Sequence, residues 1–232
     1  MAWALATSDN TAFRHCAIPI ALLPINTPMT ASARNLLLVN AATLLAALIF
    51  KWEPAWLLWP YWIQSVIVGV YARKRMLNLA RFSTKGLKSN RKPVPENEAG
   101  KRSTANFFAV HYGGFHLGYL VFLLAEHRVS GLWNMCILAA CGVSFVLSQR
   151  TTYAAQHAAD LQGKPNLGRL MFTPYLRILP MHLGIIFGSG LGGGVWLMVL
   201  FTGLKTLSDI GLDAIDRRFS VPETTVAARA PE

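Results

Sequence analysis

The stretch that decides the fold is residues 105–125, ANFFAVHYGGFHLGYLVFLLA. It is long and apolar enough to form one membrane-spanning helix, since a span needs about 20 mainly apolar residues. Within it lie His111 and His116, separated by a segment that contains Gly113 and Gly114. Titratable groups are costly in hydrocarbon and typically mark a functional site where they occur. The stretch therefore predicts a membrane helix that carries a polar site.

The rest of the chain has the composition of a membrane protein. Of its 232 residues, 53% are hydrophobic and 14% are charged, whereas soluble domains carry about a quarter charged residues. The apolar residues come in blocks that predict six spans, at 34–50, 55–77, 105–125, 131–149, 173–190 and 192–212. The glycine-rich stretch 188–194 is either a tight turn or a broken helix. The predicted fold is an all-α, polytopic transmembrane helix bundle of about six spans.

The placement of lysine and arginine predicts the orientation. Ten of the 22 basic residues lie from Arg73 to Arg102, whereas the opposite side has only Lys51 and Arg128. Because cytoplasmic loops carry the excess of basic residues, both termini are predicted to be cytoplasmic in a multi-pass protein of the bacterial inner (plasma) membrane. Six of the seven tryptophans cluster toward the other face, as in an aromatic belt.

This topology signal also accounts for the net charge of +11, so no nucleic-acid partner is expected. The predicted partners are the lipid bilayer and, at the basic loop, anionic lipids of the inner leaflet, where a basic residue near the surface gains about 1 kcal/mol. Glycine-rich helix faces also predict a surface through which an oligomer can form, because small residues let helices approach closely.

The chain is expected to have one folded domain. Residues 1–33 are predicted to be a poorly ordered N-terminal extension, with Met29 as a candidate start of translation. Residues 34–213 form the six-helix domain, with a mobile basic cytoplasmic loop at about 78–104, and 214–232 form a cytoplasmic tail. The three cysteines have no metal-ligand spacing, so neither a disulfide framework nor a zinc module is expected.

Polar side chains at membrane depth define a candidate site. Counting about 1.5 Å per residue along each helix places three of them in a midplane layer and the others nearer the cytoplasmic side. The midplane residues are Gln64, His116 and His182, and the others are His111, Ser144, Arg177, Lys205 and Asp209. The alternative interpretation is that the histidines only hold helices together and that Lys205 and Asp209, at i,i+4, pair with each other at the polar end of the last span.

The spacing of the two histidines excludes a local metal motif. They are five residues apart and so project about 140° from each other on a helix. His111 shares a stripe with Gly114 and Gly118, whereas His116 points toward the side of Tyr112 and Tyr119. Each histidine is thus expected to meet a different part of the protein.

Three stretches together resemble a known family. They are YWIQS at 61–65 with Gly69, FFAVHYGGFH at 107–116, and PYLRI at 174–178 with His182 and Gly188, followed by Lys205 and Asp209. The resemblance is to uncharacterised bacterial multi-pass membrane proteins, the domain-of-unknown-function family 6498, over residues 34–212. It implies this topology and these polar positions but no activity. The chain departs from the family pattern at Gln64, where Glu is usual, and near Gly142, where His is frequent.

Several functions are compatible with such a site. In a transport or proton-coupled protein the polar residues line a cavity, and histidine suits a proton relay because it titrates near neutral pH. In a metal- or haem-binding protein His116 and His182 are ligands from facing helices. A structural or assembly subunit needs no chemistry of its own. Ser144 lacks the second glycine of the rhomboid serine motif, and the zinc-protease motif His-Glu-x-x-His is absent. Whether a reaction is catalysed, and with which cofactor, stays open.

Overall fold

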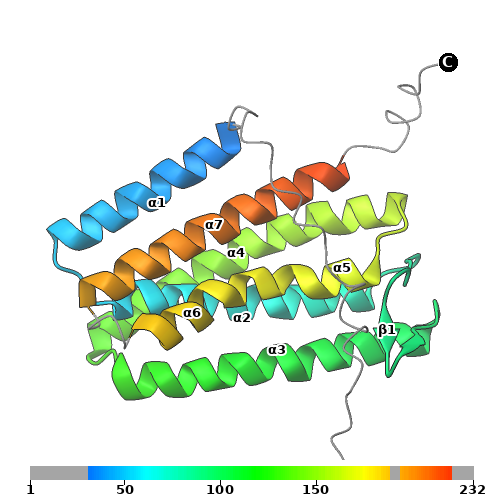
Figure 1. Cartoon of the computed structure of the whole chain (residues 1–232), viewed down its shortest axis with the longest axis horizontal. Coiled ribbons are helices and arrows are strands. Elements are labelled where there is room, and N and C mark those ends of the chain that lie inside the picture. Colours follow the sequence, from blue (N-terminus) through cyan, green and yellow to red (C-terminus); the bar gives the residue numbers. More distant parts are fainter. Residues whose placement is uncertain (1–30, 189–193, 221–232) are drawn as a thin grey trace, which may run out of the picture.

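The computed structural model describes residues 31–188 and 194–220, and most of them are helical (Figure 1). The helices are α1 (Ala31–Ile49), α2 (Ala55–Leu77), α3 (Glu98–Glu126), α4 (Leu132–Gln162), α5 (Leu167–Phe172), α6 (Ile178–Gly188) and α7 (Gly194–Ser220), and the 3-10 helix η2 (Thr173–Arg177) joins α5 to α6. A short antiparallel hairpin pairs β1 (Lys88–Ser89) with β2 (Lys92–Pro93). The helix axes run roughly parallel and alternate in direction along the chain (Figure 1). The all-α expectation is confirmed.

The helical rods follow the predicted spans. If α5, η2 and α6 are taken as one rod, the described residues contain six rods, and α2 has the predicted bounds 55–77. The helices α3 and α4 are longer than their predicted spans, because α3 begins at Glu98 and α4 continues to Gln162. Residues 189–193 of the glycine-rich stretch 188–194 lie outside the described residues. The prediction of either a tight turn or a broken helix falls on these residues and stays a prediction.

Four segments are long and apolar enough to cross a membrane: Glu98–Glu126, Leu132–Gln162, Leu167–Phe187 and Gly194–Leu212. Within the described residues, α1 supplies only the shorter apolar stretch Asn40–Ile49. The helix α2 is long enough but contains several Trp and Tyr residues and Gln64, which lower its hydropathy. The structure therefore shows a helical membrane protein, and the predicted six spans are matched only roughly.

The exposed surface of the bundle is apolar. Val110, Leu132 and Trp133 are 78%, 83% and 77% exposed, and the only buried residues of α4 are Leu138 and Asp160. Soluble monomers rarely present apolar patches of this extent to water. Lipid is the environment that covers these side chains.

The helix α2 lies at the centre of the bundle and contacts α3, α4, α5 and α6. Its buried side chains pack with those of α3 in a core that includes Tyr61, Met76, Phe108, Tyr112 and Leu123. The ring of Tyr112 lies directly on Gly69, where a Cβ atom would be 2.8 Å from Tyr112 Cδ1. A glycine is therefore required at this contact.

The helices α1 and α6 both pack on α7. The contacts of α1 are mainly with α7, beside which it lies at one edge of the bundle (Figure 1). Gly184 of α6 faces Leu197 and Phe201 of α7 at 3.7 Å from the position of an added Cβ. These are ordinary van der Waals distances, so α6 and α7 pack directly on each other at Gly184.

Residues 78–97 form a structured cap at the end of the bundle where α2 ends and α3 begins, and we call this segment the cap loop. Phe82, Leu87 and Val94 are buried in it. The Ser83 amide donates to Pro165 O at 2.9 Å, and the Leu167 amide donates to Ser83 O at 2.8 Å. A mobile loop was expected here from its polar sequence, but these contacts tie it to the segment between α4 and α5.

The predictions for the chain ends fall mostly outside the described residues. Of the predicted extension 1–33, only the backbone of 31–33 is described, as the first turn of α1. Of the predicted tail 214–232, the part up to Ser220 continues α7.

Candidate functional site

The three histidines that were predicted to lie at membrane depth gather around one row of aromatic rings along α3. We call this the histidine–tyrosine row. Its members are His111, Tyr112, Phe115, His116 and Tyr119 of α3, Tyr175 of η2 and His182 of α6.

His111 is the first residue of the row in the sequence and follows the cap loop most closely. Its Nδ1 is 2.9 Å from Tyr175 Oη, which is hydrogen-bond distance. The imidazole stacks on Phe107 with a centroid separation of 5.3 Å and meets Phe115 edge-on at 5.1 Å. His111 is an exposed residue, so this link between α3 and η2 lies at the bundle surface.

His116 is the buried histidine of the row. Its Nδ1 donates to the backbone carbonyl of Tyr112 at 2.9 Å, and its own carbonyl accepts from Trp62 Nε1 at 2.9 Å. The imidazole stacks on the Tyr112 ring with a centroid separation of 4.3 Å. Because a carbonyl can only accept, the proton lies on Nδ1, and Nε2 of the neutral ring is left as an acceptor.

His182 closes the row from α6. Its Nδ1 is 3.2 Å from Tyr119 Oη, and its ring meets Phe115 edge-on at 6.0 Å. The Tyr119 ring also contacts His116, with centroids 5.8 Å apart. Tyr119 therefore adjoins both histidines that were predicted to share the midplane layer.

The third predicted midplane residue, Gln64, is not joined to the row. Among the described residues it has no hydrogen bond with His116 or His182. Its neighbour Ser65 makes the connection instead, because the Ser65 carbonyl accepts from Tyr112 Oη at 3.0 Å. The Ser65 hydroxyl is buried and has no hydrogen-bond partner within the described part of the chain.

Arg177 lies beside the row, and its backbone is hydrogen-bonded to α2. The Arg177 carbonyl accepts from Tyr61 Oη at 2.8 Å, which links η2 to α2. Tyr61 in turn meets Phe201 of α7 edge-on, at a centroid separation of 5.0 Å. This hydrogen bond fixes the backbone of η2, between α5 and α6, against α2.

Lys205 and Asp209 form a separate cluster with Asn40, which we call the polar triad. Lys205 Nζ lies 2.6 Å from Asp209 Oδ2 and donates to Asn40 Oδ1 at 3.0 Å. Asn40 Nδ2 donates to Asp209 Oδ2 at 3.4 Å. Asn40 is 7% exposed. The triad joins α1 to α7 and has no described hydrogen bond to the histidine–tyrosine row.

Ser144 is an exposed residue of α4. The contact of α4 with α2 lies two residues earlier, where Gly142 faces Ile63 at 3.5 Å from the position of an added Cβ. Within the described residues Ser144 has no hydrogen bond to His182, so the contacts of a serine–histidine dyad are not formed there. Of the eight predicted residues, three thus belong to the row and two to the triad, and the other three, Gln64, Ser144 and Arg177, lie at separate positions.

The sequence analysis missed the partners that organise these groups. The phenols of Tyr61, Tyr119 and Tyr175 and the amide of Asn40 are hydrogen-bonded across helices. A signal was available for some of them, since buried tyrosine hydroxyls usually find a partner and a buried Asn in an apolar helix needs one. Which partner each one finds depends on helix packing.

No group of three or more His, Cys, Asp or Glu side chains in residues 31–188 and 194–220 is placed to hold a metal ion. The predicted pair His116 and His182 is a set of two side chains and stays a prediction.

Outside the apolar segments, the clearest electrostatic feature is Glu96 of the cap loop. Its carboxylate accepts from Lys164 Nζ at 2.7 Å and from the Thr84 amide at 3.0 Å. The Lys164 hydrogen bond, followed by the Thr84 amide, lowers the pKa of Glu96 to about 2. Glu96 thus stays ionised at all physiological pH values.

Comparisons with known proteins agree with the resemblance noted from the sequence motifs. The model of a family of unknown function (DUF6498) matches residues 22–225. No curated protein and no solved structure matches the chain. The matched range covers most of the chain and includes all eight predicted polar residues. The chain therefore belongs to the family of unknown function DUF6498.

Proposed function

We propose that this protein is a six-span protein of the bacterial inner membrane, with both termini in the cytoplasm, and that the histidine–tyrosine row carries protons in a transport or proton-coupled function. The distribution of basic residues supports the orientation. The alternating direction of the six helical rods is compatible with it (Figure 1).

The observation that carries the proposal is the continuity of the row. From His111 the hydrogen bond to Tyr175 is followed by ring contacts from Tyr175 to Tyr112 at 5.6 Å, Tyr112 to His116 at 4.3 Å, and His116 to Tyr119 at 5.8 Å. The hydrogen bond from Tyr119 to His182 completes the sequence. Imidazole and phenol groups both donate and accept protons, and proton relays are among the functions of titratable groups at membrane depth. The three central links are ring contacts and not hydrogen bonds, so the proposed relay requires a bridging water or a side-chain rotation at each of them.

The remaining predicted residues have different roles in this proposal. Arg177, placed beside the row by the Tyr61 contact, attracts an anionic group of the transported species. The Lys205–Asp209 pair ties α1 to α7 through Asn40. Gln64 and Ser144 have no role, because no described contact joins them to the row.

The test is proton flux in vesicles. The full chain is reconstituted into liposomes that contain a pH-sensitive dye, and a potassium diffusion potential is imposed. We expect flux above that of empty vesicles and a fall of about tenfold or more in Tyr119→Phe, which removes only the hydroxyl that contacts His182. The matched control is Tyr153→Phe, because Tyr153 lies on α4 and its hydroxyl contacts Asn78 instead.

Two results would overturn the proposal. One is flux that equals that of empty vesicles at every imposed potential. The other is wild-type flux in Tyr119→Phe and in the double variant His111→Ala/His182→Ala, since both break the row while leaving the buried His116 in place.

One observation favours a second function, a metal- or haem-binding protein with His116 and His182 as ligands. Metal-bound histidines usually donate their other ring N–H to a carbonyl or carboxylate, and His116 makes this type of hydrogen bond to Tyr112 O. Visible absorbance near the Soret band, or stoichiometric metal in the purified protein, that is lost in His116→Ala would favour this function. A structural or assembly role is favoured instead if neither flux nor a bound group is found.

The partners other than bulk lipid are also proposals. The basic side chains Lys85, Lys88, Arg91 and Lys92 of the cap loop are exposed, and we expect them to attract anionic inner-leaflet lipids in a salt-sensitive manner. The oligomer predicted from glycine faces has an available surface on α3, since a Cβ added at Gly114 or Gly118 meets no atom within 4 Å.

A further inference from the structure

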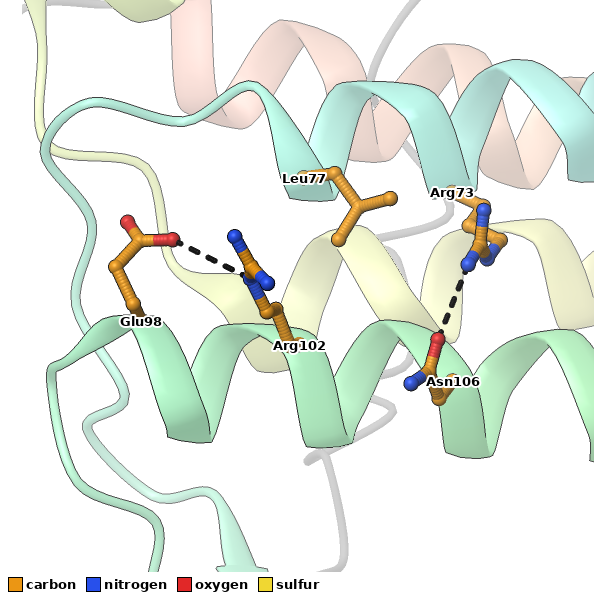
Figure 2. A pocket seen from close by; sticks show the side chains of 5 residues that line it. All are labelled: Arg73, Leu77, Glu98, Arg102 and Asn106. Carbon is orange, nitrogen blue, oxygen red and sulfur yellow. Dashed lines mark hydrogen bonds and ion pairs between the residues drawn. The ribbon is translucent and has the colours of Figure 1, made fainter.

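A cavity of about 330 Å³ lies between α2 and α3, at the end of the bundle that carries the cap loop (Figure 2). Arg73 and Leu77 extend into it from α2, and Glu98, Arg102 and Asn106 extend from α3 (Figure 2). None of these residues belongs to the histidine–tyrosine row or to the polar triad. The cavity is thus a separate feature of the molecule.

The two arginines of the cavity have unused hydrogen-bond donors. Arg73 Nη2 donates to Asn106 Oδ1 at 3.0 Å, while Arg73 Nε is buried and has no partner within the described part of the chain. Arg102 Nε is 3.9 Å from Glu98 Oε2, and the Arg102 side chain is 74% exposed. A guanidinium has five N–H donors, so most of those of Arg102 remain free for a ligand.

Among the described residues that line the cavity, the one acidic group, Glu98, is already neutralised. Glu98 Oε1 lies 2.6 Å from Lys101 Nζ, and this lysine is buried and also donates to Leu79 O at 2.8 Å. The Lys101 charge therefore offsets that of Glu98. Arg73 and Arg102 leave the cavity with a positive potential.

The position of the cavity fits the boundary between the apolar segments and the cap loop. Val70 and Phe107, which flank Arg73 and Asn106 in the two helices, are 62% and 55% exposed and thus face lipid. Lys88 and Arg91 lie beyond it in the cap loop and face water. An arginine at this depth is at the level of lipid headgroups.

We propose that this cavity binds a phosphate group, and that the group is supplied by the phosphodiester of an anionic phospholipid. Two guanidinium forks suit the oxygens of a phosphate. Leu77 provides an apolar wall against which the start of a lipid acyl chain packs, which soluble phosphate does not need. The inference rests on the membrane location of the protein and not on the proposed proton relay.

The experiment is native mass spectrometry of the full chain released from detergent, titrated separately with dioleoylphosphatidylglycerol, dioleoylphosphatidylcholine and inorganic phosphate. We expect one retained phosphatidylglycerol with at least tenfold preference over phosphatidylcholine. Arg102→Gln is expected to weaken this binding about tenfold, and Arg73→Gln/Arg102→Gln further. The matched control is Arg150→Gln, which removes the same charge from an exposed position on α4 and is expected to change the affinity less than twofold.

The variants separate loss of binding from loss of folding. Arg102 is largely exposed and its nearest described ion-pair contact is long, so Arg102→Gln is expected to keep the circular dichroism spectrum and the elution volume of the wild type. Leu77→Trp provides a second route, since it fills the cavity without changing its charge and should also abolish retention.

The outcomes discriminate between the sources of the phosphate. Retention of inorganic phosphate with the same dependence on Arg73 and Arg102, but no retention of phosphatidylglycerol, supports the phosphate site and assigns it to a soluble ligand. Equal retention of both lipids, or wild-type affinity in the folded Arg73→Gln/Arg102→Gln and Leu77→Trp variants, would overturn the proposal. A failure of the proton-flux experiment would leave it unaffected.

Discussion

The type of residue that fits at some positions of this protein is determined by how closely two helices approach each other. The contact of Gly69 with the Tyr112 ring is the clearest example, because the space for even one methyl group is taken by the ring. Tyr112 is fixed in this position by its hydrogen bond to Ser65 O and by its stacking on His116. The small residue on α2 thus sets the position of the histidine–tyrosine row on α3.

Gly69→Ala is therefore expected to destabilise the bundle by about 1–3 kcal/mol, the range found for overpacking of a filled core. The measurement is the thermal unfolding midpoint of the protein in detergent. Gly113→Ala is the control, because a Cβ at that position meets no atom within 4 Å, and alanine favours a helix over glycine. Equal midpoints for the two variants would show that the Gly69–Tyr112 contact is looser than described.

The sequence analysis identified the histidines of the row because titratable residues are costly in hydrocarbon. It placed His116 on the side of Tyr112 and Tyr119, but it did not find the tyrosines that contact His111 and His182. His111 and Tyr175 are 64 residues apart in the sequence, and Tyr119 and His182 are 63 apart. Depth along a helix is encoded locally, but the face that a helix presents to another depends on the packing of the whole bundle.

At the scale of helices, the polar triad attaches α1 to α7. This helix lies at the edge of the bundle and packs mainly on α7. Asn40 and Lys205 are hydrogen-bonded partners 165 residues apart. Removing only one partner of a charged pair in an apolar segment is costly, because the other charge is left without a partner.

We expect Asp209→Leu to lower the free energy of unfolding by about 1–3 kcal/mol, the cost of leaving a buried polar group unsatisfied. Lys205→Met/Asp209→Leu is expected to recover part of this loss, since both charges are then removed together. A double-mutant cycle of thermal stability in detergent measures the coupling. Additive effects of the two substitutions would contradict a direct interaction within the triad.

The stability that Glu96 gives the cap loop is expected to be independent of pH above about pH 4.5 and to fall progressively below it. The folded-state pKa of Glu96 is depressed to about 2, from an ordinary value of 4.5. Its contribution to stability is thus fully present above about pH 4.5 and is lost as the pH falls toward 2. Hydrogen exchange at the Thr84 amide, corrected for the intrinsic rate, is the measurement.

Glu96→Gln is the control for this titration. It removes the ionisable group, so the protection of the Thr84 amide in the variant should be lower at neutral pH and should not change between pH 5 and pH 3. A wild-type loop that loosens between pH 7 and pH 5 would assign the transition to a different group.

The helices themselves were predictable to different degrees. The bounds of α2 match the prediction, because a run of apolar residues ends at the basic sequence Arg73-Lys74-Arg75. The cap loop was not predictable, because its polar sequence indicates solvation, whereas its order depends on hydrogen bonds to Pro165 and Leu167. The extension of α4 beyond its apolar part was missed for a similar reason, since Asp160 is buried only through its ion pair with Arg75.

For the whole molecule, the alternating helices imply that consecutive connections lie at opposite ends of the bundle (Figure 1). Ser89 is in the hairpin before α3, and Ser130 lies between α3 and α4. If α3 spans the membrane in the proposed orientation, Ser89 faces the cytoplasm and Ser130 faces the other side.

Cysteine labelling tests this orientation. After Cys16, Cys136 and Cys141 are replaced by alanine, Ser130→Cys is expected to react with a membrane-impermeant maleimide in intact spheroplasts. Ser89→Cys is expected to react only after permeabilisation. The reverse pattern would invert the topology, and reaction of both cysteines in intact cells would show that α3 does not cross the membrane.

The hydrogen bonds between the cap loop and the start of α5 have a consequence for biosynthesis. Asn166 Nδ2 donates to Lys85 O across 81 residues, next to the backbone hydrogen bonds of Ser83. A ribosome must therefore translate all of α3 and α4 before the cap loop meets its partner. Until then the basic cap loop lacks these hydrogen bonds. They form only after the start of α5, in the second half of the protein, has been synthesised.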